Sequence, residues 1–234
     1  MKIVVLSAHP DDGETGAGGF CIRAVEAGHD VTIVHMSSER RNRKIGGVAE
    51  SEVRTAEGKE AARILGVKVE FMSYFMGEFP ATVESSGEIA GMLKKHRPEI
   101  VLTQWPVDSH PDHQVAGILP LRFFIWTQKF CLGFYEVFSG GQTLSFLPNR
   151  YVDISGVVTR KRESILAHKS QWPESQVQMH EKMSAFRGAE NGCEHAEAFH
   201  ILGGEKKTLF DALFEDIRTF RQSGGLDCLN MEEW

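Results

Sequence analysis

Apolar and polar positions along the first half of the chain form blocks, each either a short apolar run or a segment with helical spacing. β-branched apolar runs predict buried strands at residues 3–6, 31–36, 67–72 and 100–103. Residues 50–65 and 83–96 place apolar side chains at helical spacing, and Gly66 and Pro98 follow them as stop signals. Strands that alternate with helices in this way predict an α/β fold, with a Rossmann-like three-layer arrangement around a mostly parallel sheet.

The second half of the chain begins with a strongly apolar stretch at residues 115–138. Pro120, Arg122 and Lys129 interrupt it well short of the ~20 residues that a membrane span needs, so we expect core packing and a subunit interface there. The remaining pattern predicts a strand at 151–154, a helix at 157–168 with Ser155 as its N-cap, a helix within 181–188, a strand-like segment at 196–202 and a core-docking helix at 209–220.

Composition limits the class of protein. With 234 residues and 41% hydrophobic content, the chain can bury one sizeable core, and we expect a single domain over residues 1–234. A net charge of −6 without a basic stripe argues against nucleic acid or an anionic membrane as partner. The N-terminus shows no signal-peptide pattern, which predicts a cytoplasmic protein. No disulfide framework is expected, because the cysteines stand without paired spacing: Cys21, Cys131, Cys193 and Cys228.

Two histidine-proline-aspartate motifs carry the candidate chemistry. His9 to Asp12 (His-Pro-Asp-Asp) directly follows the strand at residues 3–6, and His110 to His113 (His-Pro-Asp-His) follows the strand at 100–103. Proline cannot sit inside a central strand, so both motifs lie at strand ends, which a parallel sheet brings to one edge. Imidazole and carboxylate groups are good ligands for a divalent cation such as zinc. Either motif alone would more often be a turn with a capping aspartate, but the pair predicts a metal site.

Two neighbouring segments have more than one interpretation. Gly16 to Gly19 would let a helix approach the sheet closely; nucleotide binding is the weaker alternative, because metal-type residues occupy the turn where a dinucleotide motif needs glycine. Residues 37–47 show no periodicity and predict a mobile loop beside the site. The basic residues of this loop are Arg40, Arg41 and Arg43. They would bind an anionic substituent of a substrate, or their charge would only keep the loop exposed to solvent.

The motifs together resemble those of the LmbE-like or PIG-L deacetylases, which remove an acetyl group from N-acetylglucosamine-type sugars in lipid-linked, thiol-linked or oligosaccharide form. The similarity follows the order of the family through most of the chain: His9 to Asp12 with Glu14, Gly16 to Gly19, Arg54-x-x-Glu57, His110 to His113, Lys169 to Gln171 and Ala196 to Phe199. It most closely resembles the branch that deacetylates the sugar precursor of bacillithiol, whose first motif also reads His-Pro-Asp-Asp-x-Glu.

The resemblance implies a zinc-dependent mechanism with a small N-acetylated sugar as substrate. The zinc ligands would leave one position open for water, and a general base would take the proton of that water and pass it to the departing amine. The resemblance implies that His9, Asp12 and His113 bind zinc and that Asp11 is the general base. It implies that His110 stabilises the oxyanion or protonates the leaving nitrogen, and that Asp112 orients His110. Arg54 would bind the substrate.

Alternatives remain for several of these residues. Asp11 and Asp12 could exchange the roles of base and ligand. His110 and Asp112 could likewise exchange their roles, or could merely cap the helix. Arg54 could form an i,i+3 surface pair with Glu57. Glu14 is expected to be a carboxylate at a helix N-terminus, favoured by the helix dipole. Most histidines outside the motifs are expected to be structural or exposed, with two candidates for the pocket: His195 and His200.

One position departs from the family pattern. Some branches place a tyrosine two residues before His110 to help bind the oxyanion, and this chain has Asp108 there. The predicted function is zinc-dependent removal of an acetyl group from an N-acetylglucosamine-type sugar, by a chain that the resemblance predicts to form a homo-oligomer. The alternatives are a metal-dependent amidase for a non-sugar N-acyl amine and a non-catalytic metal- or sugar-binding module. Iron or manganese could replace zinc in such a ligand set.

Overall fold

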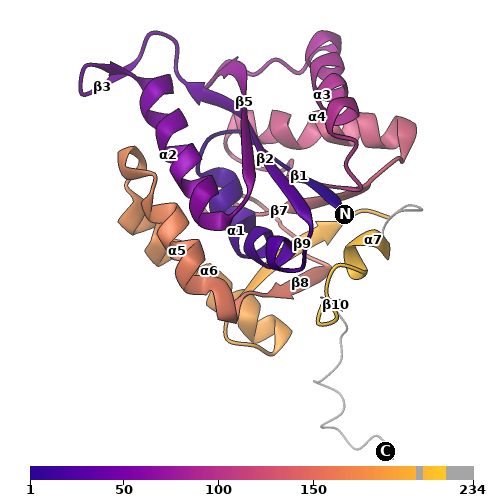
Figure 1. Ribbon diagram of the computed structural model, residues 1–234. Coiled ribbons are helices and arrows are strands. Elements are labelled where there is room, and N and C mark those ends of the chain that lie inside the picture. Colours follow the sequence, from indigo (N-terminus) through magenta and orange to yellow (C-terminus); the bar gives the residue numbers. More distant parts are fainter. Residues whose placement is uncertain (204–207, 220–234) are drawn as a thin grey trace, which may run out of the picture.

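The computed structural model describes residues 1–203 and 208–219 of the chain. The strands of its central sheet are β1 (Lys2–Ser7), β2 (Asp30–Glu39), β5 (Lys68–Phe75), β6 (Ile100–Gln104), β7 (Cys131–Tyr135), β8 (Arg150–Asp153), β9 (Ala196–Ile201) and β10 (Arg218–Thr219). They form an eight-stranded sheet in the order β10-β8-β9-β7-β6-β1-β2-β5 (Figure 1). The strands from β7 to β5 pair in parallel, whereas β9, β8 and β10 extend the sheet in antiparallel pairing. The predicted mostly parallel sheet is confirmed.

Helices cover both faces of the sheet and complete the predicted three-layer α/β fold (Figure 1). One face carries α1 (Asp12–Glu26), α2 (Glu50–Leu65), α5 (Val158–Leu166) and α6 (Pro173–Asn191), and the other carries α3 (Val83–His96) and α4 (Pro111–Thr127). Successive side chains of a strand point to opposite faces. Ile3 and Val5 of β1 therefore join the core that includes Phe20 of α1, whereas Val4 and Leu6 join the core beneath α3 and α4.

The apolar stretch at residues 115–138 supplies most of α4 and all of β7. Its core role is confirmed, because Leu119, Phe124 and Phe134 are buried. Ile125 and Trp126, near the C-terminal end of α4, are 61% and 87% exposed. Within residues 1–203 and 208–219, no helix combines the length and apolarity needed to cross a membrane.

Helix α1 is interrupted early in its course, close to the first motif. Ala17 has φ −140° and ψ 16°, outside the helical range, so the N–H groups of the next turn lose their usual acceptors. The carboxylate of Glu197 on β9 accepts these bonds from Gly19 at 2.8 Å and Phe20 at 2.7 Å, and the buried Lys161 ammonium of α5 lies 2.7 Å from it. Gly16 is needed here, because a Cβ at this position would come within 2.3 Å of the Tyr135 ring.

The prediction of an aperiodic loop at residues 37–47 was wrong in part. Strand β2 continues to Glu39, and β3 (Lys44–Ile45) pairs with β4 (Val48–Ala49) in a short hairpin. Gly46 and Gly47 form its turn with φ of 57° and 89°, the left-handed conformation that two-residue hairpin turns require. The Gly-Gly pair was the sequence signal for this hairpin.

The predicted helix at residues 209–220 is also not observed as one element. Only α7 (Thr208–Asp211) is helical, and Arg218–Thr219 forms β10 against β8; Phe220 lies outside the described residues. Phe210, Leu213 and Phe214 are nevertheless buried in the core. The apolar spacing therefore identified the docking residues but not their backbone conformation, because Arg218 and Thr219 pair with β8 instead of continuing a helix. Two ion pairs also join this segment to the rest of the fold: Arg150 with Asp211, and Arg23 with Asp216.

Two boundaries in the second half also differ from the predictions. Ser155 is not the N-cap of α5: it lies in the 3-10 turn η1 (Ser155–Val157), where its Oγ donates to the Asp153 carboxylate at 2.7 Å. The helix expected within residues 181–188 is longer and extends over Pro173–Asn191. It can begin at Pro173 because the first turn of a helix does not use the N–H group that proline lacks.

Candidate active site

The two motifs meet where the strand order reverses. β1 pairs with β2 on one side and with β6 on the other, so the carboxyl ends of β1 and β6 adjoin at the switch point of the sheet, the usual ligand site of open α/β folds. A cavity of about 440 Å³ opens there. Residues of both motifs line it, as do residues of the segments after β2, β7 and α5. The sequence prediction that both motifs lie at one edge of the sheet is confirmed.

Three predicted metal ligands lie close together at the cavity. Asp12 Oδ2 is 3.2 Å from His9 Nδ1, and Asp12 Oδ1 is 3.5 Å from His113 Nε2. All three side chains are buried, and their ligand atoms lie within 4.8 Å of one another. A tetrahedral zinc ion with bonds of about 2.0–2.1 Å separates its ligand atoms by about 3.3 Å, so this donor set fits a divalent cation of that kind.

Each of the two histidines also contacts a carboxylate through its other ring nitrogen. Asp112 Oδ2 lies 2.8 Å from His9 Nε2, and Asp108 Oδ1 lies 3.3 Å from His113 Nδ1. Histidines that bind metal usually have such a partner, which fixes the ring orientation. Asp108, which stood out in the sequence only as a departure from the family pattern, thus supports His113. A second possible ligand group, His110 with His9 and Asp112, is less enclosed.

The role predicted for Asp112 needs correction. Its carboxylate does not orient His110: it contacts His9 and accepts the Gly77 N–H at 2.7 Å. Only the backbone N–H of Asp112 reaches His110, donating to Nδ1 at 3.2 Å. The reason is that Asp112 lies in the first turn of α4 and its side chain contacts His9 at the end of β1. The order of residues within the motif could not indicate this contact.

The charges of the triad suit a cation. Burial alone favours neutral His9, but Asp12 and Asp112 raise its pKa to about 9. Burial opposes ionisation of Asp12, but His113 and His9 hold its pKa well below the usual range. Both shifts arise from the close contact of buried carboxylates with the imidazoles, and this concentration of negative charge also favours a divalent cation.

Asp11 lies beside the triad but is not part of it. Its backbone has φ 118°, and its N–H donates to Glu14 Oε2 at 3.2 Å. The carboxylate accepts from Arg54 at 3.3 Å and from Gln176 at 3.2 Å. Burial and the neighbouring Asp12 raise the pKa of Asp11, and Arg54 opposes this shift. A carboxylate with raised basicity next to a metal centre suits a general base.

His110 occupies the exposed side of the centre. Its ring stacks on that of His113 with centroids 4.6 Å apart, and it lines the cavity. Burial lowers the pKa of His110, and the neighbouring His9 and His113 lower it further. The predicted contact of His110 with a substrate is therefore sterically available, since this imidazole faces the cavity and not the core.

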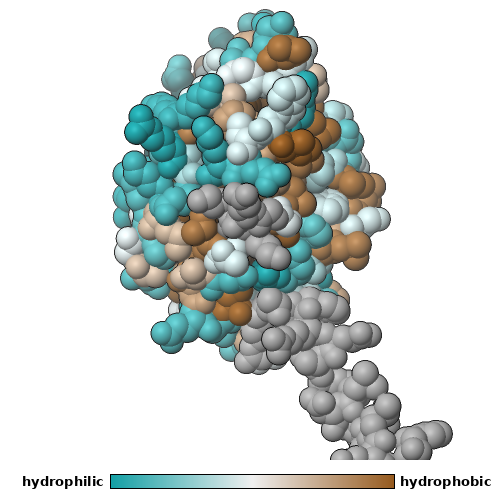
Figure 2. All heavy atoms as spheres, turned by 90° about the vertical axis from the view of Figure 1, so that its right-hand side faces the viewer, coloured by the Kyte–Doolittle hydropathy of each residue, from teal (hydrophilic) through white to brown (hydrophobic). Residues whose placement is uncertain are grey.

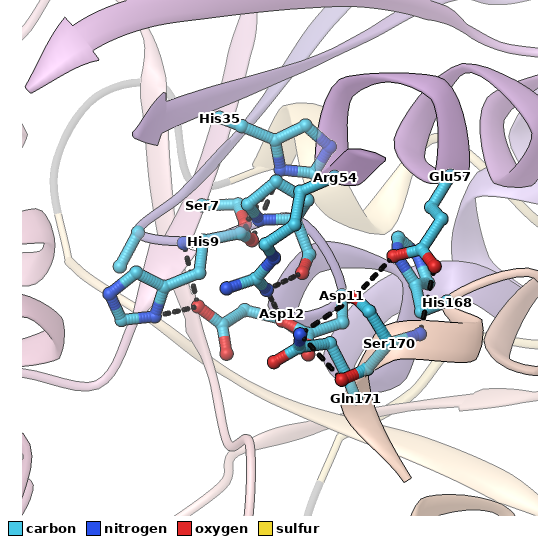
Figure 3. A network of polar contacts seen from close by, with 12 residues as sticks. Ser7, His9, Asp11, Asp12, His35, Arg54, Glu57, His168, Ser170 and Gln171 are labelled. Carbon is cyan, nitrogen blue, oxygen red and sulfur yellow. Dashed lines mark hydrogen bonds and ion pairs between the residues drawn. The ribbon is translucent and has the colours of Figure 1, made fainter. Parts of the chain in front are cut away.

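The Arg54-x-x-Glu57 motif is not a surface pair. Arg54 is 2% exposed; besides Asp11 it donates to the Pro10 carbonyl, and it lines the cavity. Glu57, one turn later on α2, accepts from the Ser170 N–H at 2.8 Å and from Ser170 Oγ at 2.7 Å. Two motifs distant in sequence are thereby joined, because Ser170 belongs to the turn η2 (Lys169–Gln171) at the cavity wall (Figure 3).

Sequence reasoning missed a buried cluster behind the first motif (Figure 3). Glu14, His35 and His168 are all fully buried, and Glu14 Oε1 is 3.3 Å from His35 Nε2 and 3.5 Å from His168 Nε2. His35 Nδ1 also lies 3.1 Å from the carbonyl of His9. Glu14 is thus more than a helix N-terminal carboxylate. Of the two roles expected for histidines outside the motifs, structural or exposed, His35 and His168 have the structural one. No sequence spacing could connect residues on three separate elements.

The predicted pocket histidines are misplaced, whereas another histidine lies in the cavity. Among the described residues that line it, neither His195 nor His200 appears, but His180 of α6 does. Of the basic residues at 40–43, only Arg40 lines the cavity, and it pairs with the buried Glu50 at 3.1 Å. Arg41 pairs with Glu78 on the surface. The loop is therefore largely neutralised by neighbouring acids.

An open, mostly parallel sheet whose switch point gathers three histidines and two aspartates of the two motifs around one cavity is the framework of an α/β enzyme. The chain belongs to the PIG-L family: the profile of this family, described as GlcNAc-PI de-N-acetylase, matches residues 4–122. It is 29% identical over 223 residues to a diacetylchitobiose deacetylase of Thermococcus kodakarensis, covering 87% of this chain and 84% of that protein. Membership of this family makes the chain a hydrolytic N-deacetylase.

Solved structures agree with this assignment. The N,N'-diacetylchitobiose deacetylase of Pyrococcus horikoshii, in complex with an inhibitor, matches with a TM-score of 0.74 and 25% identity, covering 86% of this chain and 83% of that one. GalB, the 4-carboxy-2-hydroxymuconate hydratase of Pseudomonas putida, also matches with a TM-score of 0.74, at 23% identity over 87% of this chain and 97% of that one. The second match shows the fold alone.

Proposed function

We propose that the chain is a zinc-dependent hydrolase that removes the acetyl group from an N-acetylglucosamine-type sugar conjugate, and that residues 1–234 make one deacetylase domain. The observation that carries the proposal is the buried triad of His9, Asp12 and His113 beside Asp11 in a cavity at the switch point. A single sheet that takes strands from Lys2 to Thr219 supports the one-domain arrangement.

The residues of the chain divide the chemistry between them. When bound by the triad, a divalent cation supplies Lewis-acid chemistry, which acidifies water and polarises an amide carbonyl. Asp11 takes the proton of the attacking water and returns it to the departing amine. Arg54 and Gln176 hold the Asp11 carboxylate in place through one oxygen each. His110, which faces the cavity, donates a hydrogen bond to the developing oxyanion or a proton to the leaving nitrogen.

The group attached to the sugar distinguishes two versions of the proposal. An oligosaccharide such as diacetylchitobiose is favoured by the named relatives. The sugar precursor of bacillithiol, a malate glycoside, is favoured by the resemblance of the first motif and by Arg40, the cation on the cavity rim. Because Arg40 already pairs with Glu50, the first version has the stronger support.

We also propose a homo-oligomer. Support comes from large apolar side chains that the described part of the chain leaves exposed, and Figure 2 shows hydrophobic groups exposed between hydrophilic ones on one face. The exposed large apolar side chains of the described residues include Val107, Ile125, Trp126, Leu144 and Leu147. Sedimentation velocity should give a multiple of the 26.2 kDa chain mass, whereas a monomer at micromolar concentration would contradict this part of the proposal.

The first test is acetate release with zinc present and then chelated. The panel comprises N-acetylglucosamine, its malate glycoside, diacetylchitobiose and an N-acetyl amino acid. Chelator-sensitive turnover of a sugar is expected. Turnover of the amino acid alone would replace the sugar deacetylase with a general amidase, and zinc binding without any acetate release would favour a non-catalytic module.

Two variants test the assigned roles. Asp11→Asn should bind zinc normally but lose activity by about a hundredfold or more, since general-base catalysis contributes roughly 10²–10⁴. His113→Ala should lose both zinc and activity. Full activity in Asp11→Asn would exclude Asp11 as the base, and normal zinc content in His113→Ala would exclude His113 as a ligand.

A further inference from the structure

The outer part of the cavity is not used by the proposed chemistry. The triad, Asp11 and Arg54 occupy its inner end, whereas much of its remaining lining comes from segments after β2 and β7 and from the junction of η2 with α6. This outer wall includes two aromatic residues, Phe138 and Trp172, and two residues with side-chain amides, Gln142 and Gln171.

Trp172 has an unusual conformation and position. Its side chain is 79% exposed although it lines the cavity. Its backbone has φ 50° and ψ 54°, which is unfavourable for a residue with a Cβ and also for a residue that precedes proline. Single exposed aromatic residues are common on surfaces, but a strained one on a cavity rim calls for a functional explanation.

The surrounding structure holds this strained backbone from both sides. The Trp172 carbonyl accepts the N–H groups of Ser175 at 3.1 Å and Gln176 at 3.3 Å in the first turn of α6. On the other side, Glu57 fixes the turn η2 through two bonds to Ser170. The backbone that carries the indole is therefore held in place before any ligand arrives, which lowers the entropy cost of binding.

The chemistry of the outer wall fits an uncharged, hydroxylated ring. Among described residues that line the cavity outside the two motifs, the cations are Arg40 and Arg54, and each already has a carboxylate partner, Glu50 and Asp11. Side-chain amides both donate to and accept from hydroxyl groups. An aromatic face packs against the apolar C–H face of a pyranose. A bare carboxylate or phosphate would find no unpaired cation here.

We propose that Trp172 is the platform of an outer subsite, where its indole stacks on a second, uncharged sugar ring joined to the N-acetyl sugar that the inner site holds. The subsite makes the enzyme selective for a disaccharide or longer oligosaccharide over a free monosaccharide. This inference rests on the proposed deacetylase function, since the inner site must hold the N-acetyl group.

The test compares N,N'-diacetylchitobiose with N-acetylglucosamine in the zinc-loaded enzyme. Wild type should prefer the disaccharide in kcat/KM. Trp172→Ala should reduce this preference by about three- to tenfold, through KM of the disaccharide, as expected for one aromatic stacking contact. Trp172→Phe should retain most of the preference. Phe186→Ala is the matched control: Phe186 is an aromatic residue of α6, the helix that follows Trp172; it is 60% exposed and does not line the cavity.

A binding titration on chelated enzyme separates this inference from the proposed function. Without turnover, disaccharide affinity should fall in Trp172→Ala by the same factor and remain unchanged in Phe186→Ala. If wild type hydrolyses neither sugar, the proposed function fails, and the titration still decides the subsite. An unchanged preference and affinity in Trp172→Ala would overturn the subsite. A change in sedimentation of this variant would also overturn it, by assigning Trp172 to a contact between copies of the chain.

Discussion

At the residue scale, a supporting group holds each side chain of the proposed chemistry. Asp112 contacts His9, Asp108 contacts His113, and Arg54 contacts the carboxylate of Asp11. Such contacts restrict the rotamers of the reacting groups, so the site is organised before the substrate binds. Replacing a supporting residue should therefore lower the rate of the chemical step.

Arg54→Lys tests this for the general base. Lysine keeps the charge but cannot bridge the Asp11 carboxylate and the Pro10 carbonyl as a planar guanidinium does, so kcat should fall about tenfold or more with little change in KM. Steady-state kinetics on the best sugar of the panel measures the split. Arg63→Lys, at an exposed i,i+3 pair on the same helix, is the control and should behave as wild type. A rise in KM at constant kcat would instead assign Arg54 to substrate binding alone.

His180 should make stability depend on pH. Burial, together with the nearby Lys161, lowers the pKa of this histidine well below its usual value, and Asp12 opposes the shift. In the folded chain His180 stays neutral, whereas in the unfolded chain it takes up a proton below about pH 6.5. The free energy of unfolding therefore falls as the pH drops below about 6.5, by at most about 1.4 kcal/mol per pH unit from this residue.

Urea unfolding of chelated protein at pH 8, 6.5 and 5.5 measures this dependence. The variant His180→Gln has no titrating group at the position, so its stability should decline less steeply between pH 6.5 and 5.5. Chelation in all samples removes the separate effect of metal loss at low pH. Parallel curves for the variant and wild type would contradict the assignment of a neutral buried imidazole.

At the element scale, the break in α1 depends on β9. Glu197 accepts the N–H groups of Gly19 and Phe20 that the break leaves without helical acceptors, and it neutralises Lys161, which is 5% exposed. These contacts fix the helix that begins with Asp12. The family-like segment Ala196 to Phe199 thus acts through the backbone of α1, not in the cavity.

Replacing Glu197 with alanine should destabilise the chain strongly. The variant leaves a buried ammonium group unpaired, which costs about 3–5 kcal/mol in comparable cases. Glu197→Gln keeps one acceptor and should cost less, about 1–3 kcal/mol. Urea denaturation measures both, with Glu194→Ala at an 81% exposed side chain as a control near zero. A loss below about 1 kcal/mol in Glu197→Ala would show that the pair is not needed for stability.

At the scale of the whole molecule, the triad joins segments about a hundred residues apart. His9 and Asp12 follow β1, whereas His113 lies in the first turn of α4 on the opposite layer. A bound cation therefore links the β1 end to a helix of the other face. Because the unfolded chain has no such site, binding free energy adds to folding free energy.

Chelation should accordingly lower the thermal midpoint. Zinc at about 100 times its Kd stabilises by about 2.7 kcal/mol, which corresponds to a shift of about 5–10 °C for a chain of this size. Differential scanning calorimetry with and without chelator measures the shift, and added zinc should reverse it. His113→Ala should show no such shift. An equal midpoint for wild type in both conditions would mean that no metal bridges the two segments.

Much of the fold and the inner site could be predicted from the sequence, because both depend on local patterns. The helices at residues 50–65 and 83–96 have the predicted bounds, and the strands at 3–6 and 100–103 carry the motifs at their ends. The prediction of one helix at residues 209–220 was wrong, because apolar residues that pack against the core from a turn can have the same spacing as those of a helix. The hairpin at 44–49 was missed although its Gly-Gly turn is visible in the sequence.

The sequence by itself determined the alternation of strands and helices and the position of the two motifs at strand ends. Both depend on neighbouring residues, because the spacing of apolar side chains sets the type of element and a proline ends a strand. Only the tertiary structure decided which carboxylate supports which histidine, because Asp112 meets His9 across 103 positions of the chain. It also decided the burial of Glu14 between two histidines and the place of Trp172 on the cavity rim. These contacts arise from the packing of separate elements, which no local pattern contains.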